Sequence, residues 1–471
     1  MLIRNARLWP PRAHAGFPLT DVRITGDRIA ECAAGLRPVP AEDDIDANGC
    51  ALLPGLHDHH VHLLALAAAR ASVRAGPPWV RTAAELRTAL READASAPPD
   101  AWLRCVGYHE SVAGDLDRWA VDRLLPHRPV RIQHRTGALW VVNSLAATRL
   151  RLEECDLAAV ERDSDGRPTG RVWRMDAWLA GRVPGAPPDL AVVSAEAACL
   201  GVTGFTDATP GATETDLQSL AGALADGTIA QRVHCMAPPE VSLPACQKLG
   251  LGPAKILLDD DALPPLHELS DRMRHAHAAG RPVAVHCVTR VQLVLTLAAL
   301  DAAGRLPGDR IEHGAVIRAE TLPDLRGLTV VSQPHFVGER GEQYASDVAP
   351  EDLPDLWRLR SLRAAGVAVA AGSDAPFGGA DPWHVMRSAT ARPENLGPGE
   401  AIGPAAAIGL FLGEPSAPGT PRRVAPGRLA DLVLLRCPPR EAALSLASDR
   451  VAATFVGGEL VYARNVLRAA K

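Results

Sequence analysis

The stretch PGLHDHHVHLL, residues 54–64, places four histidines and one aspartate in six consecutive positions of an otherwise apolar segment. Burying a polar side chain is costly unless it finds a partner, so this composition indicates a strand with a function. Side chains two positions apart point to the same face of a strand, so His60 and His62 share one face. His57 and His59 have the opposite phase, and we expect them to pack or to support other groups.

Two imidazoles on one face at the end of a strand are half of a metal site, because neutral imidazole binds zinc and related divalent ions. The alternative is that one or both are ordinary core or surface histidines. His286 in VAVHCV, His313 in RIEHG and Asp374 in GVAVAAGSD also stand at the ends of apolar runs. An N-cap or an Asx turn is the other role open to Asp374.

Short apolar runs alternate with helical, Ala- and Leu-rich stretches along the middle of the chain, which is the pattern of parallel strands joined by helices. Eight runs follow this pattern: 50–63, 201–208, 231–237, 254–260, 282–288, 310–317, 329–336 and 366–374. The pattern predicts an α/β fold with a closed, TIM-like (β/α)8 barrel. The active site of such a barrel lies at the C-terminal ends of its strands.

The two ends of the chain show the alternation and the Gly-Asp or Gly-Gly turns of antiparallel hairpins, as in DVRITGDRIAEC and VAATFVGGELVYA. We expect residues 1–54 and 424–471 to form one small β-sandwich domain, and residues 55–423 to form the barrel. The apolar runs WLRCVGY and PVRIQHR fall between the first and second barrel strands. We therefore predict an insertion beside the barrel mouth at about residues 70–195.

The composition indicates a globular protein that acts on small molecules. Of its 471 residues, 47% are hydrophobic, and the net charge of −5 comes without blocks of like charge, so neither nucleic acid nor a membrane is expected as a partner. The N-terminus lacks the apolar segment of a signal peptide. Nine cysteines without regular spacing are typical of a reducing cytoplasm. A homodimer is the default expectation for the oligomeric state.

Lysine is rare in this chain. Of the 50 basic residues only Lys248, Lys255 and Lys471 are lysines. A lysine kept in the apolar run AKILLDD therefore indicates a property that arginine lacks. A neutral, buried amine can add carbon dioxide to give an anionic carbamate, which can bridge two metal ions. The alternative is a strand-edge lysine whose ammonium group reaches solvent.

These residues carry a family resemblance. PGLHDHHVH, together with Lys255, His286, His313 and the segment GSDAPFGGADPW, resembles the metal-dependent amidohydrolase superfamily, and in particular its amidohydrolase-3 group of YtcJ-like enzymes. The resemblance extends to WLRCVGYHE, GALWVVNSLA, DGRPTGRV and APGRLADLVLL. It implies a metal-dependent hydrolase that cleaves a non-peptide C–N bond, in an amide, formamide or cyclic amide, with a metal-activated hydroxide.

The resemblance also implies one or two divalent transition-metal ions, with zinc the first choice, and six ligands: His60, His62, Lys255, His286, His313 and Asp374. His60 and His62 would bind the more buried ion, and His286 and His313 the second. A carbamate on Lys255 would bridge the two ions. Asp374 would also be the catalytic base, taking the proton of the attacking hydroxide and passing it to the leaving amine.

The chain departs from the family pattern on the substrate side. Arg290 ends the segment CVTR, which follows His286 where the family usually has Gly-Asp, and Arg174 replaces a glutamate. These arginines can bind an acidic substrate bidentately, or they can be solvated surface residues. Other substrate-binding candidates stand at expected strand ends or in the loops that follow, with packing as their alternative role: Tyr108, His109, Gln333, His335 and Trp383.

Two other functions remain open from the sequence. One is a mononuclear deaminase of the same superfamily, which would have a glutamate at Thr289 and no lysine ligand. The other is a non-catalytic, metal-binding relative, a class that typically loses metal ligands. This chain keeps Lys255 and the other five ligand residues, so hydrolysis is the preferred hypothesis.

Overall fold

The computed structural model of the chain describes residues 1–10, 17–185 and 187–464. The chain divides into two compact units, Met1–Leu63 with Leu190–Lys471, and Leu64–Asp189. Within the described ranges, no helix combines the length and the apolar character that crossing a membrane requires.

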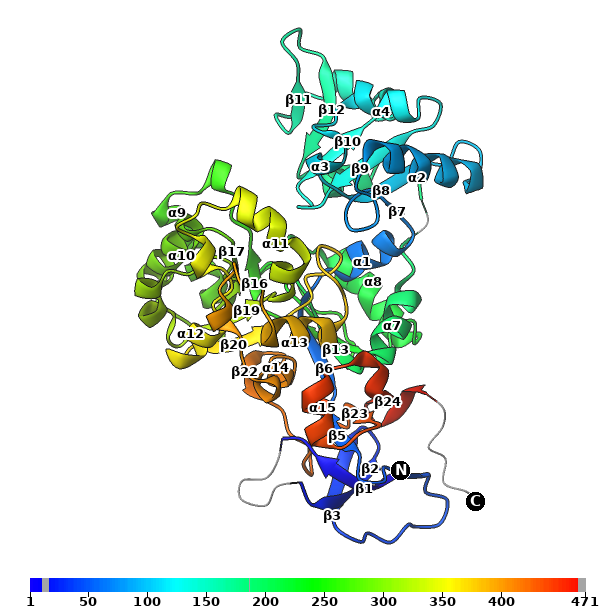
Figure 1. Cartoon of the computed structure of the whole chain (residues 1–471), viewed down its shortest axis with the longest axis vertical. Coiled ribbons are helices and arrows are strands. Elements are labelled where there is room, and N and C mark those ends of the chain that lie inside the picture. The colour runs from blue at the N-terminus through cyan, green and yellow to red at the C-terminus, as the bar shows by residue number, and fades with distance from the viewer. Residues whose placement is uncertain (11–16, 186, 465–471) are drawn as a thin grey trace. The chain divides into compact units, whose positions relative to one another are not determined.

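Both ends of the chain contribute to one eight-stranded sheet of the first unit, with the order β25-β24-β23-β5-β1-β2-β3 and with β4 beside β1. Blue and red strands accordingly lie together in Figure 1. The strands are β1 (Leu2–Leu8), β2 (Leu19–Thr25), β3 (Arg28–Ala33), β4 (Asp44–Asp46), β5 (Ala51–Pro54), β23 (Leu432–Leu435), β24 (Val451–Val456) and β25 (Glu459–Ala463). The expected hairpins pair antiparallel, whereas β1 runs parallel to β4 and β5. A separate β-sandwich domain of residues 1–54 and 424–471 stays a prediction.

The middle of the chain forms two parallel sheets, with the orders β6-β13-β14-β15 and β16-β17-β18-β19-β20. Their strands are β6 (Leu56–Val61), β13 (Val202–Asp207), β14 (Arg232–Cys235), β15 (Leu249–Leu251), β16 (Ala254–Ile256), β17 (Val283–Cys287), β18 (Arg310–His313), β19 (Thr329–Ser332) and β20 (Ala368–Ala371). Each of the eight expected runs contains one of these strands. The strand β15 was not expected, and the run 50–63 also contributes β5 to the terminal sheet.

Helices separate most of these strands, as the alternation predicts. A short hairpin lies between α14 and β23 in the sequence. The helices are α7 (Leu190–Cys199), α8 (Glu214–Ala225), α9 (Leu266–Ala278), α10 (Arg290–Ala303), α11 (His335–Asp347), α12 (Leu359–Ala364), α13 (Pro382–Thr390), α14 (Pro404–Gly409) and α15 (Pro439–Ser445). The hairpin strands are β21 (Gly413–Glu414) and β22 (Ala417–Pro421).

The expected closed sheet of eight strands is not present among the described residues, because the two parallel sheets are open. Pro253, between β15 and β16, has no N–H to donate to a ladder. At the other edge, the backbone of β6 and of His62 forms hydrogen bonds with residues that follow β20. There the Asp374 N–H donates to the His60 carbonyl at 2.7 Å, and the His62 N–H donates to the Ala375 carbonyl at 2.9 Å.

Gly372 makes this meeting possible. A Cβ atom at Gly372 would lie 2.4 Å from the His60 nitrogen and 2.5 Å from the His60 Cβ. Both distances are far below van der Waals contact, so any larger residue would push the two segments apart. The approach of Gly372 to His60 therefore places Asp374 next to the histidine strand.

The Leu64–Asp189 unit has its own six-stranded sheet, with the order β11-β12-β10-β9-β8-β7. The strands are β7 (Val73–Arg74), β8 (Leu103–Tyr108), β9 (Val130–His134), β10 (Leu139–Val142), β11 (Val160–Arg162) and β12 (Pro168–Trp173). The helices are α1 (Leu63–Arg70), α2 (Ala83–Ser96), α3 (Glu110–Ala113), α4 (Arg118–Leu124), α5 (Ser144–Arg149) and α6 (Asp176–Ala180). Two buried clusters form its core, one around Ile132 and one around Trp140.

We expect Gly372→Ala to lower the free energy of unfolding by about 1–3 kcal/mol, because the added methyl group overlaps the backbone of His60. The measurement is chemical denaturation followed by circular dichroism. Gly222→Ala is the matched control: its Cβ meets nothing within 4 Å inside α8, and the helix should gain up to about 1 kcal/mol. Equal losses in both variants would contradict the proposed role of Gly372.

Candidate metal centre

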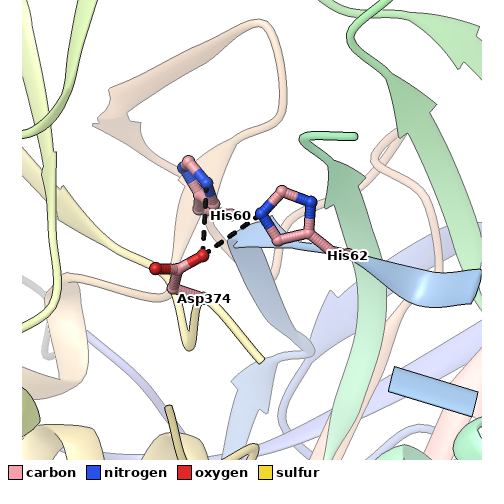
Figure 2. A group of neighbouring side chains, drawn as sticks. All are labelled: His60, His62 and Asp374. Atoms are coloured by element: carbon pink, nitrogen blue, oxygen red, sulfur yellow. Dashed lines mark ion pairs between the residues drawn. The ribbon is translucent and has the colours of Figure 1, made fainter. Parts of the chain in front are cut away.

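His60, His62 and Asp374 converge on one point of the first unit. One oxygen of Asp374, Oδ1, lies 3.2 Å from His62 Nε2 and 3.6 Å from His60 Nε2 (Figure 2). The three side chains are almost fully buried, with exposed fractions of 1%, 12% and 9% in the order His60, His62 and Asp374. The shared face predicted for His60 and His62 thus points at a carboxylate.

The backbone of Asp374 is in the left-handed region, with φ at 49°. This conformation is unfavourable for a residue with a side chain, and it persists only where the surroundings hold it in place. The Asp374 N–H bond to His60 holds it on one side, and the Phe377 N–H donates to the Asp374 carbonyl at 2.8 Å on the other. In this conformation the carboxylate faces the two imidazoles.

The other three predicted ligands lie in the same neighbourhood. Lys255 Nζ is 3.5 Å from His60 Nε2. The ring centre of His313 is 4.8 Å from that of His60 and 4.6 Å from that of His286. The structure therefore brings the six residues together, and their action as ligands stays a prediction.

Glu312 and Arg310 support His60, and the sequence analysis did not single them out. His60 Nδ1–H donates to Glu312 Oε2, while Arg310 Nε donates to Glu312 Oε1 at 2.5 Å. Glu312 is 0% exposed and Arg310 is 1% exposed. The sequence could have indicated both residues, because two charged residues stand in the segment RIEHG of an expected buried strand and a buried charge needs a partner.

Asp58 is a second supporting group that the analysis missed, although its position within the histidine stretch was visible. Its carboxylate accepts from the Ser373 N–H at 2.9 Å and from the Ser373 hydroxyl at 2.5 Å. Burial raises the pKa of Asp58 to about 6 despite these bonds. Asp58 thus ties the histidine strand to the residue before Asp374.

Burial and neighbouring charges decide the protonation states of the cluster. Burial lowers the pKa of His60 to about 4 and that of His313 to about 3, so both imidazoles are neutral near neutral pH. Burial also lowers the pKa of Lys255. For Asp374, burial alone would raise the pKa, but the imidazoles of His62, His60 and His313 outweigh it and hold the pKa far below its usual range.

The donor set fits a divalent metal ion. The ligand atoms of His60, His62 and Asp374 lie within 4.8 Å of one another. Because His60 donates its Nδ1 proton to Glu312, its Nε2 lone pair faces Asp374, as zinc ligation requires. Among the described residues, no donor is aligned for a hydrogen bond with the buried Oδ1 of Asp374. Two imidazole nitrogens and a carboxylate oxygen are ligands that zinc accepts.

Of the substrate-binding candidates in the first unit, three are engaged in packing or support. Gln333 Oε1 accepts from His313 Nδ1–H at 2.9 Å, which orients that ring. His335 Nε2–H donates to the Ser373 carbonyl at 3.0 Å, and Trp383 Nε1–H donates to the Leu200 carbonyl at 2.9 Å. All three side chains are fully buried. Contact with substrate stays a prediction for each.

Arg290 is the first residue of α10 and is 42% exposed. Its Nε lies 3.1 Å from Asp352 Oδ1, so an acidic substrate would have to compete with this carboxylate.

Tyr108, His109 and Arg174 belong to the Leu64–Asp189 unit. The Tyr108 hydroxyl donates to the Gly114 carbonyl at 2.5 Å, which fixes the turn around α3. Arg174 has a left-handed backbone, with φ at 51°. Their predicted contacts with a substrate remain predictions.

The chain is similar to known hydrolases over most of its length. The model of a family described as "Amidohydrolase family" matches residues 43–462. The N-substituted formamide deformylase of Arthrobacter pascens is 24% identical, with 94% of this chain and 95% of that protein aligned. The putative amidohydrolase YtcJ of Bacillus subtilis is also 24% identical, with 75% of each chain aligned.

Solved structures agree in fold. An uncharacterised metal-dependent hydrolase from Pyrococcus horikoshii superposes with a TM-score of 0.74 at 16% identity, covering 92% of this chain and 97% of its own. Atrazine chlorohydrolase from Arthrobacter aurescens, in complex with zinc, superposes with a TM-score of 0.57 at 15% identity, covering 98% of this chain and 94% of its own. The resemblance to the amidohydrolase family is confirmed by the family match over residues 43–462 and by the two relatives.

We expect Gln333→Leu to weaken metal binding about 10–100-fold, because leucine keeps the volume but cannot accept the His313 Nδ1 proton. Competition with a chromophoric chelator measures the affinity. Gln218→Leu on the exposed face of α8 is the control and should bind as the parent does. An unchanged affinity in Gln333→Leu, with a raised KM instead, would assign Gln333 to substrate binding.

Proposed function

The chain belongs to the amidohydrolase family, and from that premise we propose that it cleaves a C–N bond of a small amide, formamide or cyclic amide at a metal centre built around His60. Family membership makes the chain a hydrolase that acts on carbon–nitrogen bonds. The observation that carries the proposal for the site is the buried Asp374 Oδ1, which faces the Nε2 atoms of His60 and His62.

In this proposal the six predicted ligands hold one or two divalent ions, with zinc the first choice. His60 and His62 would hold one ion, His286 and His313 would hold the other, and Lys255 would contribute a carbamate as a further ligand. The position of Lys255 Nζ beside His60 Nε2 supports this assignment. A bound divalent ion supplies a lowered pKa for a coordinated water and polarises the scissile carbonyl.

The chain's own residues supply the positioning and the proton transfer. Asp374 is the general base: its carboxylate accepts the proton of the attacking water and then releases it to the leaving nitrogen. Glu312 holds the His60 ring in place through Nδ1, and Gln333 does the same for His313. Burial of the cluster strengthens these electrostatic contacts, because little water screens them.

N-substituted formamides are the first substrates to test, because the deformylase that resembles this chain aligns over nearly its full length.

We also propose that the two parallel sheets are parts of a (β/α)8 barrel, with the terminal strands as a β-sandwich domain. A cytoplasmic location follows from the cysteine pattern, and a homodimer from the frequency of dimers.

The deaminase alternative finds no support at the position where it needs a glutamate. Thr289 stands there, caps α10 and donates its hydroxyl proton to Asp260 at 3.0 Å.

His60→Ala should reduce the bound metal and lower kcat by at least about 100-fold, because it removes a ligand atom of the centre. Elemental analysis of the purified chain and hydrolysis of N-formyl, N-acyl and cyclic-imide compounds are the two measurements. A chelator should abolish activity and added zinc should restore it. His127→Ala, at an exposed histidine of the second unit, is the control. A metal-free chain with full activity would refute the proposal.

Lys255→Ala should lose metal and most activity, and short carboxylic acids should restore part of both by taking the place of the carbamate. Lys255→Arg should fail despite its charge, because guanidinium cannot form a carbamate. Lys248→Arg is the matched control, since Lys248 Nζ only donates to the Ala230 carbonyl. Normal turnover in Lys255→Arg would show that no carbamate is needed.

A further inference from the structure

The Leu64–Asp189 unit carries two arginines side by side on one face of its sheet. Arg104 in β8 and Arg131 in β9 are Cα partners in the parallel register. Trp140 in β10 pairs with Gln133, which lies two residues after Arg131 and therefore on the same face. The opposite face packs onto the buried cluster around Ile132. The strand register thus brings two guanidinium groups and one indole together.

Trp140 contacts both guanidinium groups. The Arg104 Cζ atom lies 5.3 Å from the centre of the Trp140 ring, and the Arg131 Cζ atom lies 5.0 Å from it. The indole is fixed, because it is 2% exposed and its Nε1–H donates to Asp176 Oδ1 at 2.8 Å. An aromatic ring attracts a guanidinium group without using its N–H donors. Trp140 therefore orients the two arginines and leaves their donors to other partners.

These donors find few partners in the protein. Arg104 Nη1 donates to the Ser72 hydroxyl at 2.7 Å, which carries no charge. Arg131 Nε is buried, and no acceptor among the described residues is aligned with it. Within the described ranges, neither arginine forms an ion pair. Asp176 is the carboxylate whose charge acts on both, but it is exposed and its Oδ1 already binds the Trp140 indole.

The two positive charges disfavour each other. Burial, and then the charge of Arg131, lowers the pKa of Arg104 to about 10. Burial lowers the pKa of Arg131 as well. A guanidinium group nevertheless stays protonated in proteins, so both charges persist at neutral pH. Partly buried charges need a counter-charge, and an anion bound between the two arginines would provide it.

We propose that Arg104 and Arg131 bind the oxyanion group of a small molecule, either a carboxylate or a phosphate. A guanidinium group presents its donors in a planar fork that matches both kinds of oxyanion bidentately. Both arginines are partly exposed, so an anion can reach them from solution. The site uses residues of the Leu64–Asp189 unit alone and none of the predicted metal ligands.

The competing explanation is that water and the Trp140 ring satisfy the two arginines. In that case Arg104 and Arg131 only support the packing of β8 and β9 around Trp140. An anion would then bind no better here than at any other arginine of the surface. The two explanations differ in whether a saturable anion site exists and in whether it depends on both arginines.

The test is a calorimetric titration of the full-length chain, stripped of metal so that no ion at the proposed metal centre can bind the anion. Inorganic phosphate is the probe in one arm and acetate in the other, at constant ionic strength in chloride buffer. At least one anion should bind with one equivalent per chain, and the tighter arm identifies the group. Arg131→Gln and Arg104→Gln should each weaken this binding at least tenfold. Arg123→Gln is the matched control and should bind as the parent does, because Arg123 is an exposed arginine of α4 in the same unit.

Failure of both anions to bind, or equal affinity in Arg131→Gln and the parent, would overturn the proposal. Thermal unfolding followed by circular dichroism is the second measurement, and it also reports whether each variant folds. A saturating anion should raise the unfolding temperature of the parent and of Arg123→Gln by several degrees, because it binds the folded state. The same anion should leave the unfolding temperatures of Arg131→Gln and Arg104→Gln unchanged. An equal rise in all four chains would equally refute the site.

Discussion

The buried chain of contacts from Arg310 through Glu312 to His60 is the interaction on which the proposed metal centre depends. A carboxylate that is 0% exposed is tolerated because a guanidinium neutralises it on one side and an imidazole N–H binds it on the other. This arrangement fixes the tautomer of His60 and directs its Nε2 to the place where Asp374 and Lys255 also point. Removing either charge would leave the other buried and unpaired.

Backbone geometry complements this chain of charges. Asp374 and His313 both have left-handed backbones at the ends of parallel strands, with φ of 49° and 67°. Such conformations are costly and concentrate at functional sites. Here the close approach of Gly372 to His60 and the hydrogen bond from Asp374 to His60 hold one of them. The left-handed residues thus lie at the end of β18, in His313, and just after β20, in Asp374.

The sequence predicted the strands well, because strand periodicity needs only local information. His60 and His62 were expected on one face of a strand and Asp374 at the end of another strand, and their ligand atoms lie within 4.8 Å of one another. The predicted closed barrel is not present among the described residues, because closure depends on pairing at two sheet edges. Pro253 stands at one of these edges, and β6 and His62 bond to residues 374 and 375 at the other. The hydrogen-bond partners of Gln333 and Trp383 could not be predicted from the sequence either. Tertiary packing decides whether a polar side chain contacts a substrate or the protein core.

The most direct test of the central claim is anomalous X-ray diffraction at the zinc edge, from crystals of the full-length chain grown with zinc. The account predicts a strong peak about 2.0–2.2 Å from the Nε2 atoms of His60 and His62 and close to Asp374. A second peak beside His286 and His313 would correspond to the second ion. Well-ordered density for these side chains with no anomalous peak between them would contradict the account.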